Sequence, residues 1–241
     1  MDRVALISGG AKGIGRAIGL RLAKDGWSVA FCYRTSADEA AQTATDIVAQ
    51  GGRALPVQCD VSDPEAAARL VRQVEEAWGR IDALINCAGP YHKTGILRET
   101  AEGWASMFDN NLHPVFYLSK AVAPGMKTRK WGRILAFSMA DADQLHAKPM
   151  VTAHYASKVA ILVLVKSLAR ALAAHGVTVN AISPGFVSSA SAEEQEEMGK
   201  RIPAGYVGSV EDAANAAMYL ISDDARYVTG SNIHLSGGWG I

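Results

Sequence analysis

The sequence predicts an α/β fold: one doubly wound domain built on a parallel seven-stranded sheet in the order 3-2-1-4-5-6-7. Short apolar runs alternate with helical patterns along all 241 residues, as in parallel sheets that helices cover on both faces. The first of these runs leads directly into a glycine-rich turn that opens a helix. The length suits one large domain, and 49% of the residues are hydrophobic, which is enough for a sizeable core.

Each expected strand is a short run of mainly apolar residues, and each expected helix carries apolar residues at helical spacing. The expected strands are 3–8, 28–33, 53–59, 81–86, 132–138, 177–182 and 232–235. The expected helices are 14–25, 36–50, 63–78, 101–128, 153–175 and 210–222. Gly26 follows the first helix, where glycine commonly ends a helix. The third helix has a typical start in Ser62 or Asp63 before Pro64.

The segment 188–205 is the least regular part of the chain and is rich in Ser, Ala and Glu. We expect it to form a small mobile lid over the substrate, between the sixth strand and the last helix. No linker, low-complexity tract or repeat divides the rest, so residues 1–241 are expected to form one domain.

Composition argues against several classes of partner. The 24 Lys and Arg residues balance the 24 Asp and Glu residues, so the chain has no basic field that would attract nucleic acid. No apolar run reaches membrane-spanning length, and the first strand begins too close to Met1 for a signal peptide. Cys32, Cys59 and Cys87 are scattered and odd in number, which is typical of buried thiols in a reducing compartment. We therefore expect a soluble cytoplasmic protein that binds neither nucleic acid nor membrane. The histidines lack metal-ligand spacing, so no catalytic metal is expected.

The glycine-rich turn is Ser8-Gly9-Gly10-Ala11-Lys12-Gly13-Ile14-Gly15. Glycine lets the backbone turn tightly and approach a ligand, because no Cβ is in the way. A helix that opens beside such a turn points free N–H groups and the positive end of its dipole at a phosphate. The turn therefore predicts a dinucleotide site of the Rossmann type. Its expected contacts are Gly9, Lys12, Gly13, Ile14 and Gly15.

The end of the second strand bears on which dinucleotide binds. An acidic residue there would bind the ribose hydroxyls of NAD, but the sequence has Arg34, followed by Thr35. Arg34 and Lys12 together suit the 2′-phosphate of NADP. NADP(H) is therefore the expected cofactor.

Other strand ends supply further expected cofactor contacts, because the ligand of a doubly wound sheet lies beyond the carboxyl ends of its strands. The Asp60 carboxylate could accept from the adenine amino group, and the small residues after the fourth strand let a ribose pass over the backbone. A hydroxyl at Ser189 could hold a carboxamide. The expected contacts are Asp60, Val61, Asn86, Ala88, Gly89, Pro184, Gly185 and Ser189.

In this order and over the whole length, these motifs resemble the short-chain dehydrogenase/reductase family. The family's glycine turn matches the turn at residues 9–15, its Asn-Ala-Gly segment matches residues 86–89, and its Pro-Gly turn matches residues 184–185. The resemblance implies carbonyl reduction by a serine, a tyrosine, a lysine four residues after the tyrosine, and an asparagine. In that chemistry the tyrosine gives a proton to the substrate oxygen, while the nicotinamide delivers hydride.

Only half of this catalytic set matches. Asn111 and Lys158 stand where the family's asparagine and lysine belong. The position four residues before Lys158 holds His154, and Tyr155 comes one residue late, about 100° away around a helix. The family's serine would fall at Met139.

The substitution at position 154 changes the chemistry, since a lysine charge disfavours imidazolium and lowers the pKa of a neighbouring histidine. Three interpretations stay open. A local deformation of the helix lets Tyr155 act as the acid, His154 acts as the acid or as a relay with a nearby aspartate such as Asp141 or Asp143, or the site binds cofactor without ordinary carbonyl chemistry.

Substrate signals point in two directions. Tyr91 follows the Asn-Ala-Gly segment, where an aromatic side chain could stack on a flat ring, as in the pteridine reductases of the family. The segments from Gly132 and around 203–205 are similar to the 3-oxoacyl thioester reductases. We expect NADPH-dependent reduction of a carbonyl on a small 3-oxoacyl-thioester-like substrate, which Tyr91 and Met139 are expected to contact. The alternatives are a pteridine-type C=N reductase and an NADP-binding regulatory or scaffold subunit without catalysis.

The expected helix that contains His154 continues with Val159-Ala160-Ile161-Leu162-Val163-Leu164-Val165, which is apolar all round. A helix with no polar face is buried on every side. The resemblance implies that this helix packs against its twin in a neighbouring subunit, so a homodimer or homotetramer is expected.

Overall fold

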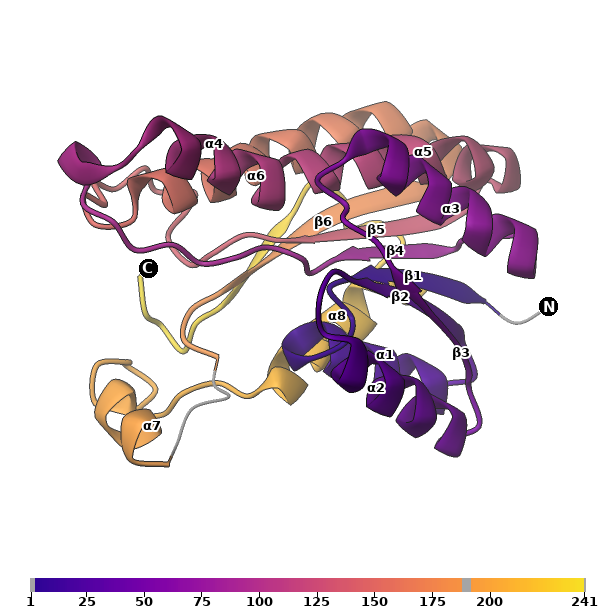
Figure 1. The fold of residues 1–241 in the computed structure, drawn as a ribbon, viewed down its shortest axis with the longest axis horizontal. Coiled ribbons are helices and arrows are strands. Elements are labelled where there is room, and N and C mark those ends of the chain that lie inside the picture. Colours follow the sequence, from indigo (N-terminus) through magenta and orange to yellow (C-terminus); the bar gives the residue numbers. More distant parts are fainter. Residues whose placement is uncertain (1–2, 188–191, 241) are drawn as a thin grey trace.

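The computed structural model describes residues 3–187 and 192–240, and within them one parallel sheet lies between two helical layers (Figure 1). The sheet has seven strands in the order β3-β2-β1-β4-β5-β6-β7, and every neighbouring pair is parallel. The predicted fold class and strand order are therefore confirmed. The strands are β1 (Val4–Ser8), β2 (Ser28–Tyr33), β3 (Arg53–Gln58), β4 (Ala83–Asn86), β5 (Gly132–Phe137), β6 (Val177–Pro184) and β7 (Asn232–Leu235).

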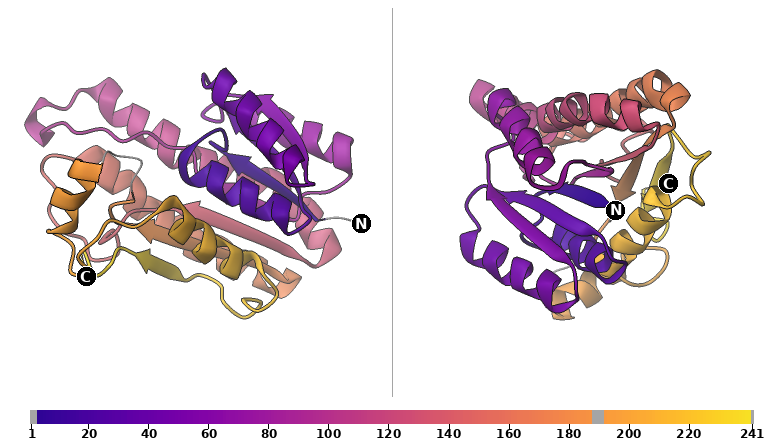
Figure 2. Two further views of the ribbon diagram at one scale, coloured as in Figure 1. Left: turned by 90° about the horizontal axis from the view of Figure 1, so that it is seen from below. Right: turned by 90° about the vertical axis from the view of Figure 1, so that its right-hand side faces the viewer.

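The α-helices are α1 (Gly13–Lys24), α2 (Ala37–Ala49), α3 (Pro64–Trp78), α4 (Ala101–Asn111), α5 (His113–Arg129), α6 (Thr152–Leu172), α7 (Ala192–Gly199) and α8 (Val210–Ile221). Two short 3₁₀ helices, η1 (Ile96–Arg98) and η2 (Ala173–His175), accompany them. Helices α3, α5 and α6 cover one face of the sheet and α1, α2 and α8 cover the other, as Figure 1 and the end view of Figure 2 show.

Each face of the sheet buries its own apolar cluster. One cluster joins the sheet to α3, α5 and α6 through residues such as Leu70, Leu118 and Ile161. The other joins it to α1, α2 and α8 through residues such as Ile18 and Leu220. The central strands β1 and β4 are buried along their whole length, as expected for strands covered on both faces.

The expected helix 101–128 is two helices, α4 and α5, separated at Leu112. Pro114 stands in the first turn of α5, where its missing N–H costs nothing, whereas inside a continuous helix it would remove a hydrogen bond. The prediction of one helix was wrong because it passed over this proline. The expected start of α3 is confirmed, since the Asp63 side chain accepts from the N–H groups of Glu65 and Ala66.

The carboxyl ends of all strands lie at one edge of the sheet, away from the N-terminus (Figure 1). Helix α7 and the C-terminal segment lie at this edge, and Trp239 packs on Phe186 with ring centroids 4.8 Å apart. Helix α7 falls within the segment 188–205, and the expectation that this segment is a mobile lid stays a prediction. In the part of the chain that the structure describes, no helix is long and apolar enough to cross a bilayer.

Candidate active site

The glycine turn between β1 and α1 is as tight as its sequence requires. Gly9 has φ +69°, and a Cβ there would lie 3.0 Å from the Ala88 backbone. Gly13 also has a positive φ, and a Cβ at Gly15 would lie 2.4 Å from the Gly9 carbonyl oxygen. Side chains at Gly9 or Gly15 would therefore force the turn apart.

Helix α1 begins beside this turn without a side-chain cap. Lys12 occupies the N-cap position in an extended conformation, and it makes no capping hydrogen bond. The first turn, which includes Ile14, carries no acidic residue. The first N–H groups of the helix and its positive dipole end are therefore available to an anion such as a pyrophosphate.

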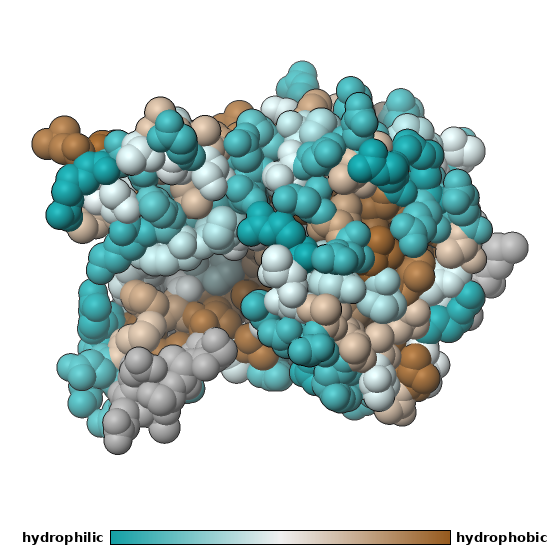
Figure 3. Space-filling model, in the orientation of Figure 1, coloured by the Kyte–Doolittle hydropathy of each residue, from teal (hydrophilic) through white to brown (hydrophobic). Residues whose placement is uncertain are grey.

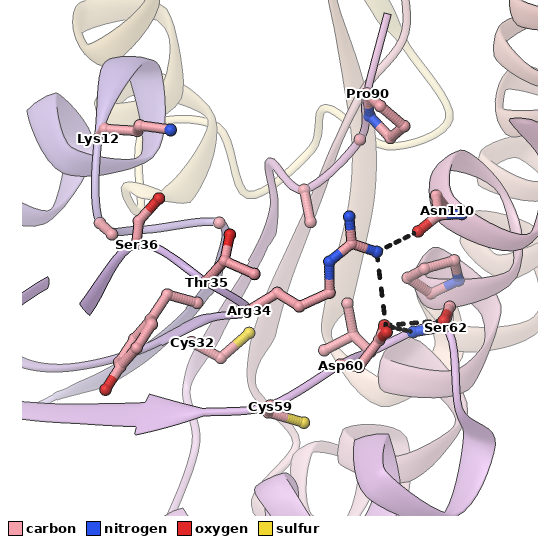
Figure 4. A pocket seen from close by; sticks show the side chains of 17 residues that line it. Lys12, Cys32, Arg34, Thr35, Ser36, Cys59, Asp60, Ser62, Pro90 and Asn110 are labelled. Carbon is pink, nitrogen blue, oxygen red and sulfur yellow. Dashed lines mark hydrogen bonds and ion pairs between the residues drawn. The ribbon is translucent and has the colours of Figure 1, made fainter. Parts of the chain in front are cut away.

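A cavity of about 380 Å³ extends from the glycine turn across the ends of β2, β3 and β4 (Figure 4). It brings together eight of the residues that the sequence analysis assigned to cofactor binding. These are Gly9, Lys12, Arg34, Thr35, Asp60, Val61, Ala88 and Gly89. Figure 3 shows the surface hollowed at the same edge of the sheet.

Arg34 crosses this cavity toward α4. Its guanidinium donates to Asn110 Oδ1 at 3.0 Å and lies 3.7 Å from Asp60 Oδ2, while Lys12 and Ser36 lie on the opposite side (Figure 4). Partial burial raises the pKa of Asp60, but hydrogen bonds from Ser62 and the Arg34 charge outweigh it, so that the net shift of the pKa is downward. Asp60 is therefore an ionised acceptor at neutral pH.

Sequence reasoning missed Asn110 as a residue of this cavity. It precedes Asn111, the predicted catalytic asparagine, at the end of α4. The pair of adjacent asparagines was a signal that the end of this helix faces a polar site.

Asn111 and Lys158 converge on Gly89 at the inner end of the cavity. A Cβ at Gly89 would lie 2.4 Å from Asn111 Oδ1 and 3.5 Å from Lys158 Nζ. Asn111 Nδ2 donates to the carbonyls of Met107 and Pro90, at 3.0 and 3.2 Å, whereas its buried Oδ1 has no partner in the described part of the chain. That oxygen is a free acceptor beside the lysine.

Lys158 lies on α6 and is almost fully buried. Its Nζ donates to the Phe137 carbonyl at 2.9 Å. Burial lowers the pKa of Lys158 to about 8, with a small opposing effect of Cys87. The lysine is therefore still mostly protonated at pH 7. Burial also raises the pKa of the neighbouring Cys87 thiol, so this cysteine is a neutral packing group.

His154 faces the same site from the preceding turn of α6. Its ring stands edge-on to the Tyr91 ring, with centroids 5.2 Å apart and an interplanar angle of 73°. Burial, and then the Lys158 charge, lower the pKa of His154 to about 4, while a hydrogen bond with the Pro90 carbonyl opposes the shift. His154 is therefore neutral at pH 7, and its Nδ1 has no partner among the described residues.

Tyr155 is directed into the protein. It belongs to the apolar cluster under α3, α5 and α6. Its hydroxyl donates to the Asp141 carbonyl at 2.9 Å and accepts from the His146 N–H at 3.0 Å. Helix α6 is regular through this segment, without the deformation that would turn Tyr155 toward Lys158.

The residues after β5 contact other parts of the protein and do not line the cavity. Ser138 Oγ donates to the Lys158 carbonyl at 2.8 Å, and Met139 packs against the apolar cluster under α6. Asp141 forms an ion pair with Lys148, and Asp143 lies 2.8 Å from His234 Nε2. The carboxylates of both aspartates are thus paired within the loop and with β7.

The remaining expected cofactor residues lie outside this cavity. Asn86 is buried and ties β4 to β5 through a 3.1 Å hydrogen bond from its Nδ2 to the Leu135 carbonyl. Pro184 ends β6, and a Cβ at Gly185 would lie 3.0 Å from Ser236 Cβ. Ser189 lies outside the described residues. Over residues 3–187 and 192–240, no three metal-ligating side chains are grouped, and the expectation of a metal-free site stays a prediction.

Comparison with known proteins finds relatives of one family over nearly the whole chain. Residues 9–240 match the family described as Enoyl-(Acyl carrier protein) reductase. The chain is 34% identical to the 3-oxoacyl-[acyl-carrier-protein] reductase FabG of Staphylococcus aureus, over 99% of this chain and 98% of that protein. It is also 34% identical to the 3-oxoacyl-[acyl-carrier-protein] reductase of Synechocystis, with coverage of 98% and 96%.

Solved structures agree with the fold. Acetoin dehydrogenase YohF from Salmonella typhimurium superimposes with a TM-score of 0.91, at 27% identity over 99% of this chain and 96% of that one. A short-chain type dehydrogenase/reductase from Mycobacterium ulcerans superimposes with a TM-score of 0.89, at 31% identity over 99% and 90%. The chain therefore belongs to the short-chain dehydrogenase/reductase family of oxidoreductases.

Proposed function

We propose that this oxidoreductase uses NADPH to reduce the carbonyl of a small 3-oxoacyl-thioester-like substrate. The main support is that the Asn111 and Lys158 side chains both lie next to Gly89. This glycine lines the cavity that extends from the glycine turn. The similarity to two proteins named 3-oxoacyl-[acyl-carrier-protein] reductase supports the substrate class.

The charges around the cavity support NADPH over NADH. Arg34 and Lys12 line it, and its only carboxylate among the lining residues, Asp60, is already paired with Arg34. A 2′-phosphate would meet two cations at this end, whereas a bare ribose would find no carboxylate free to accept from its hydroxyls.

The residues present fit a nicotinamide cofactor, which would supply the hydride. The uncapped start of α1 would hold the pyrophosphate. Lys158 would hold the ribose next to the ring, and its ammonium would stabilise negative charge that develops on the substrate oxygen. Asn111 Oδ1, which has no partner among the described residues, would accept a hydrogen bond from a water or from the ammonium.

Of the two neighbouring residues, His154 rather than Tyr155 would face the substrate oxygen. The Tyr155 hydroxyl is bonded to the loop after β5, whereas His154 faces Lys158 and Tyr91. His154 is neutral at pH 7, so its part is to position the substrate or to pass a proton through water.

The test combines binding and turnover. Calorimetric titration should show NADPH binding, with weaker binding of NADH, and NADPH should be oxidised when an acetoacetyl thioester is added. A Gly9→Val chain is the matched control, because its side chain would collide with the Ala88 backbone and should abolish binding. Failure of both nucleotides to bind the unaltered chain would contradict the proposal.

A pteridine-type C=N bond is the second candidate substrate. The Tyr91 ring, 65% exposed at the mouth of the site, supports it, because a flat heterocycle could stack there. Oxidation of NADPH by dihydrobiopterin, with no response to the acyl thioester, would favour this alternative. Tight NADPH binding with no turnover of either would favour a non-catalytic regulatory or scaffold subunit.

We further propose a cytoplasmic homodimer or homotetramer that assembles through α5 and α6. Val163 on α6 is 63% exposed and Phe116 on α5 is 44% exposed, both on the outer helical layer. Covering such apolar side chains is what a partner subunit of the same chain would do.

A further inference from the structure

Apart from the Lys158 ammonium, which donates to the Phe137 carbonyl, the groups of α6 and β5 at this site lack a proton suited to a substrate oxygen. The Ser138 hydroxyl already donates its proton to the Lys158 carbonyl, and the Tyr155 hydroxyl donates to the Asp141 carbonyl. His154 is neutral at pH 7, and a neutral imidazole releases its remaining proton far less readily than an imidazolium. A neutral acid for the substrate oxygen must therefore come from another element.

The loop after β4 brings a phenol to this place. Tyr91 is 65% exposed, and its hydroxyl makes no hydrogen bond within residues 3–187 and 192–240. Its ring lies against the ring of His154, at 5.2 Å between centroids. A substrate oxygen held beside His154 is thus within the reach of one tyrosine side chain.

Hydrogen bonds to Asn111 and His154 hold the loop after β4 against the site. The carbonyl of Pro90, the residue before Tyr91, accepts from Asn111 Nδ2 at 3.2 Å and also bonds His154. Tyr91 is therefore attached directly to the residue that links the asparagine to the histidine. The next residue, His92, lies 3.0 Å from Glu99, which ties the loop to the segment just before α4.

We propose that Tyr91, on the loop after β4, is the general acid of the reaction, and that His154 positions its ring. This inference rests on the proposed carbonyl reduction. The carbonyl carbon would take a hydride from NADPH, which is thereby oxidised to NADP⁺, and the C=O π electrons would move to oxygen. The Tyr91 O–H bond breaks, the alcohol O–H bond forms, and a phenolate remains.

A phenol suits this step, because its hydroxyl carries a proton that it can donate to an alkoxide. Exposure completes the cycle, since solvent water can return the proton to the Tyr91 phenolate directly. An acid on this loop therefore needs no buried proton path through α6.

The experiment compares Tyr91→Phe with Tyr91→Leu at saturating NADPH and substrate. Tyr91→Phe removes only the hydroxyl and keeps the ring contact with His154, so kcat should fall by about 100-fold or more with an unchanged Kd for NADPH. Tyr91→Leu should lose no more kcat than Tyr91→Phe, because the hydroxyl carries the effect. Tyr219→Phe, which alters a tyrosine on α8 that is 48% exposed, should keep the kcat of the unaltered chain.

The outcomes separate this inference from the proposed function. Full kcat in Tyr91→Phe, with a loss only in Tyr91→Leu, would show that the ring stacks and that the hydroxyl is no acid. An unaltered chain that binds NADPH but reduces no carbonyl would contradict the proposed function, and this inference with it. Turnover of the unaltered chain and collapse in Tyr91→Phe alone would support both.

Discussion

At the scale of single residues, the buried His154 imidazole stands beside Tyr91 and close to Lys158. Burial and the Lys158 charge keep the His154 imidazole neutral, with a pKa of about 4. Because His154 is neutral, it adds no second positive charge beside the buried Lys158, whose own pKa burial lowers to about 8. Two cations side by side in this low-dielectric place would repel each other strongly.

Tyr155→Phe should leave kcat within about two-fold of the unaltered chain, because the Tyr155 hydroxyl is bonded to the loop after β5 and not to the site. The variant should instead lose about 1 kcal/mol of unfolding free energy, the usual worth of a buried hydrogen bond. Steady-state kinetics and urea unfolding measure the two effects. Loss of activity at unchanged stability would place the acid at Tyr155 after all.

Arg34→Asp should shift the preference from NADPH toward NADH. The change removes a cation that would meet the 2′-phosphate and adds a carboxylate that can accept from ribose hydroxyls. The ratio of the two dissociation constants measures it, with Arg69→Asp as a control, since Arg69 lies on α3 and pairs only with Glu65 among the described residues. An unchanged ratio would refute the 2′-phosphate assignment.

At the scale of the elements, a buried carboxylate joins the two central strands. Asp82, just before β4, is fully buried and accepts from the Val4 N–H of β1 at 2.9 Å. Arg80 donates to both of its oxygens, at 2.6 and 2.7 Å, and Arg129 of α5 lies 3.8 Å away. The tie fixes the ends of β1 and β4 that lie opposite the cavity.

Arg80→Ala should destabilise the fold by about 3–5 kcal/mol, since it removes the partner that makes two hydrogen bonds to the buried Asp82 carboxylate. Urea unfolding monitored by tryptophan fluorescence measures the loss. Arg72→Ala on α3 is the control, because no ion pair of Arg72 occurs in the described ranges. A loss below 1 kcal/mol would mean that Arg129 and water compensate for the missing guanidinium.

At the scale of the whole molecule, the helical layers on the two faces of the sheet contribute different parts of the candidate site. The layer of α1, α2 and α8 supplies the glycine turn and the dipole of α1, whereas the layer of α4 and α6 supplies Asn111, His154 and Lys158. The cavity lies at the carboxyl ends of β2, β3 and β4, and the loop that carries Tyr91 follows β4. A doubly wound sheet provides such a crevice where its winding reverses, here between β1 and β4.

Val163→Glu should dissociate the proposed oligomer. The charge would be placed in an apolar helix face that a partner subunit buries, and it would have to be desolvated there. Analytical ultracentrifugation of the unaltered chain and the variant measures the change in mass. An unaltered chain that sediments as a monomer would refute the assembly proposal.

Comparison of the sequence with the structure shows where pattern reasoning works. The strand order, the glycine turn and the meeting of eight predicted cofactor residues in one cavity follow from local signals, because a parallel sheet brings its carboxyl ends to one edge whatever the packing details. The break between α4 and α5 was also legible in Pro114, although it was not predicted. The bond between Arg34 and Asn110 was not legible, since it joins residues 76 positions apart.

By itself, the sequence determined the fold and the glycine-rich turn between β1 and α1. Helical periodicity also established that His154 and Tyr155 point about 100° apart. Only the tertiary structure decided which of the two faces Lys158. The rotation of α6 about its axis is set by the apolar residues it buries against the sheet, and this packing draws Tyr155 into the core and leaves His154 beside Tyr91.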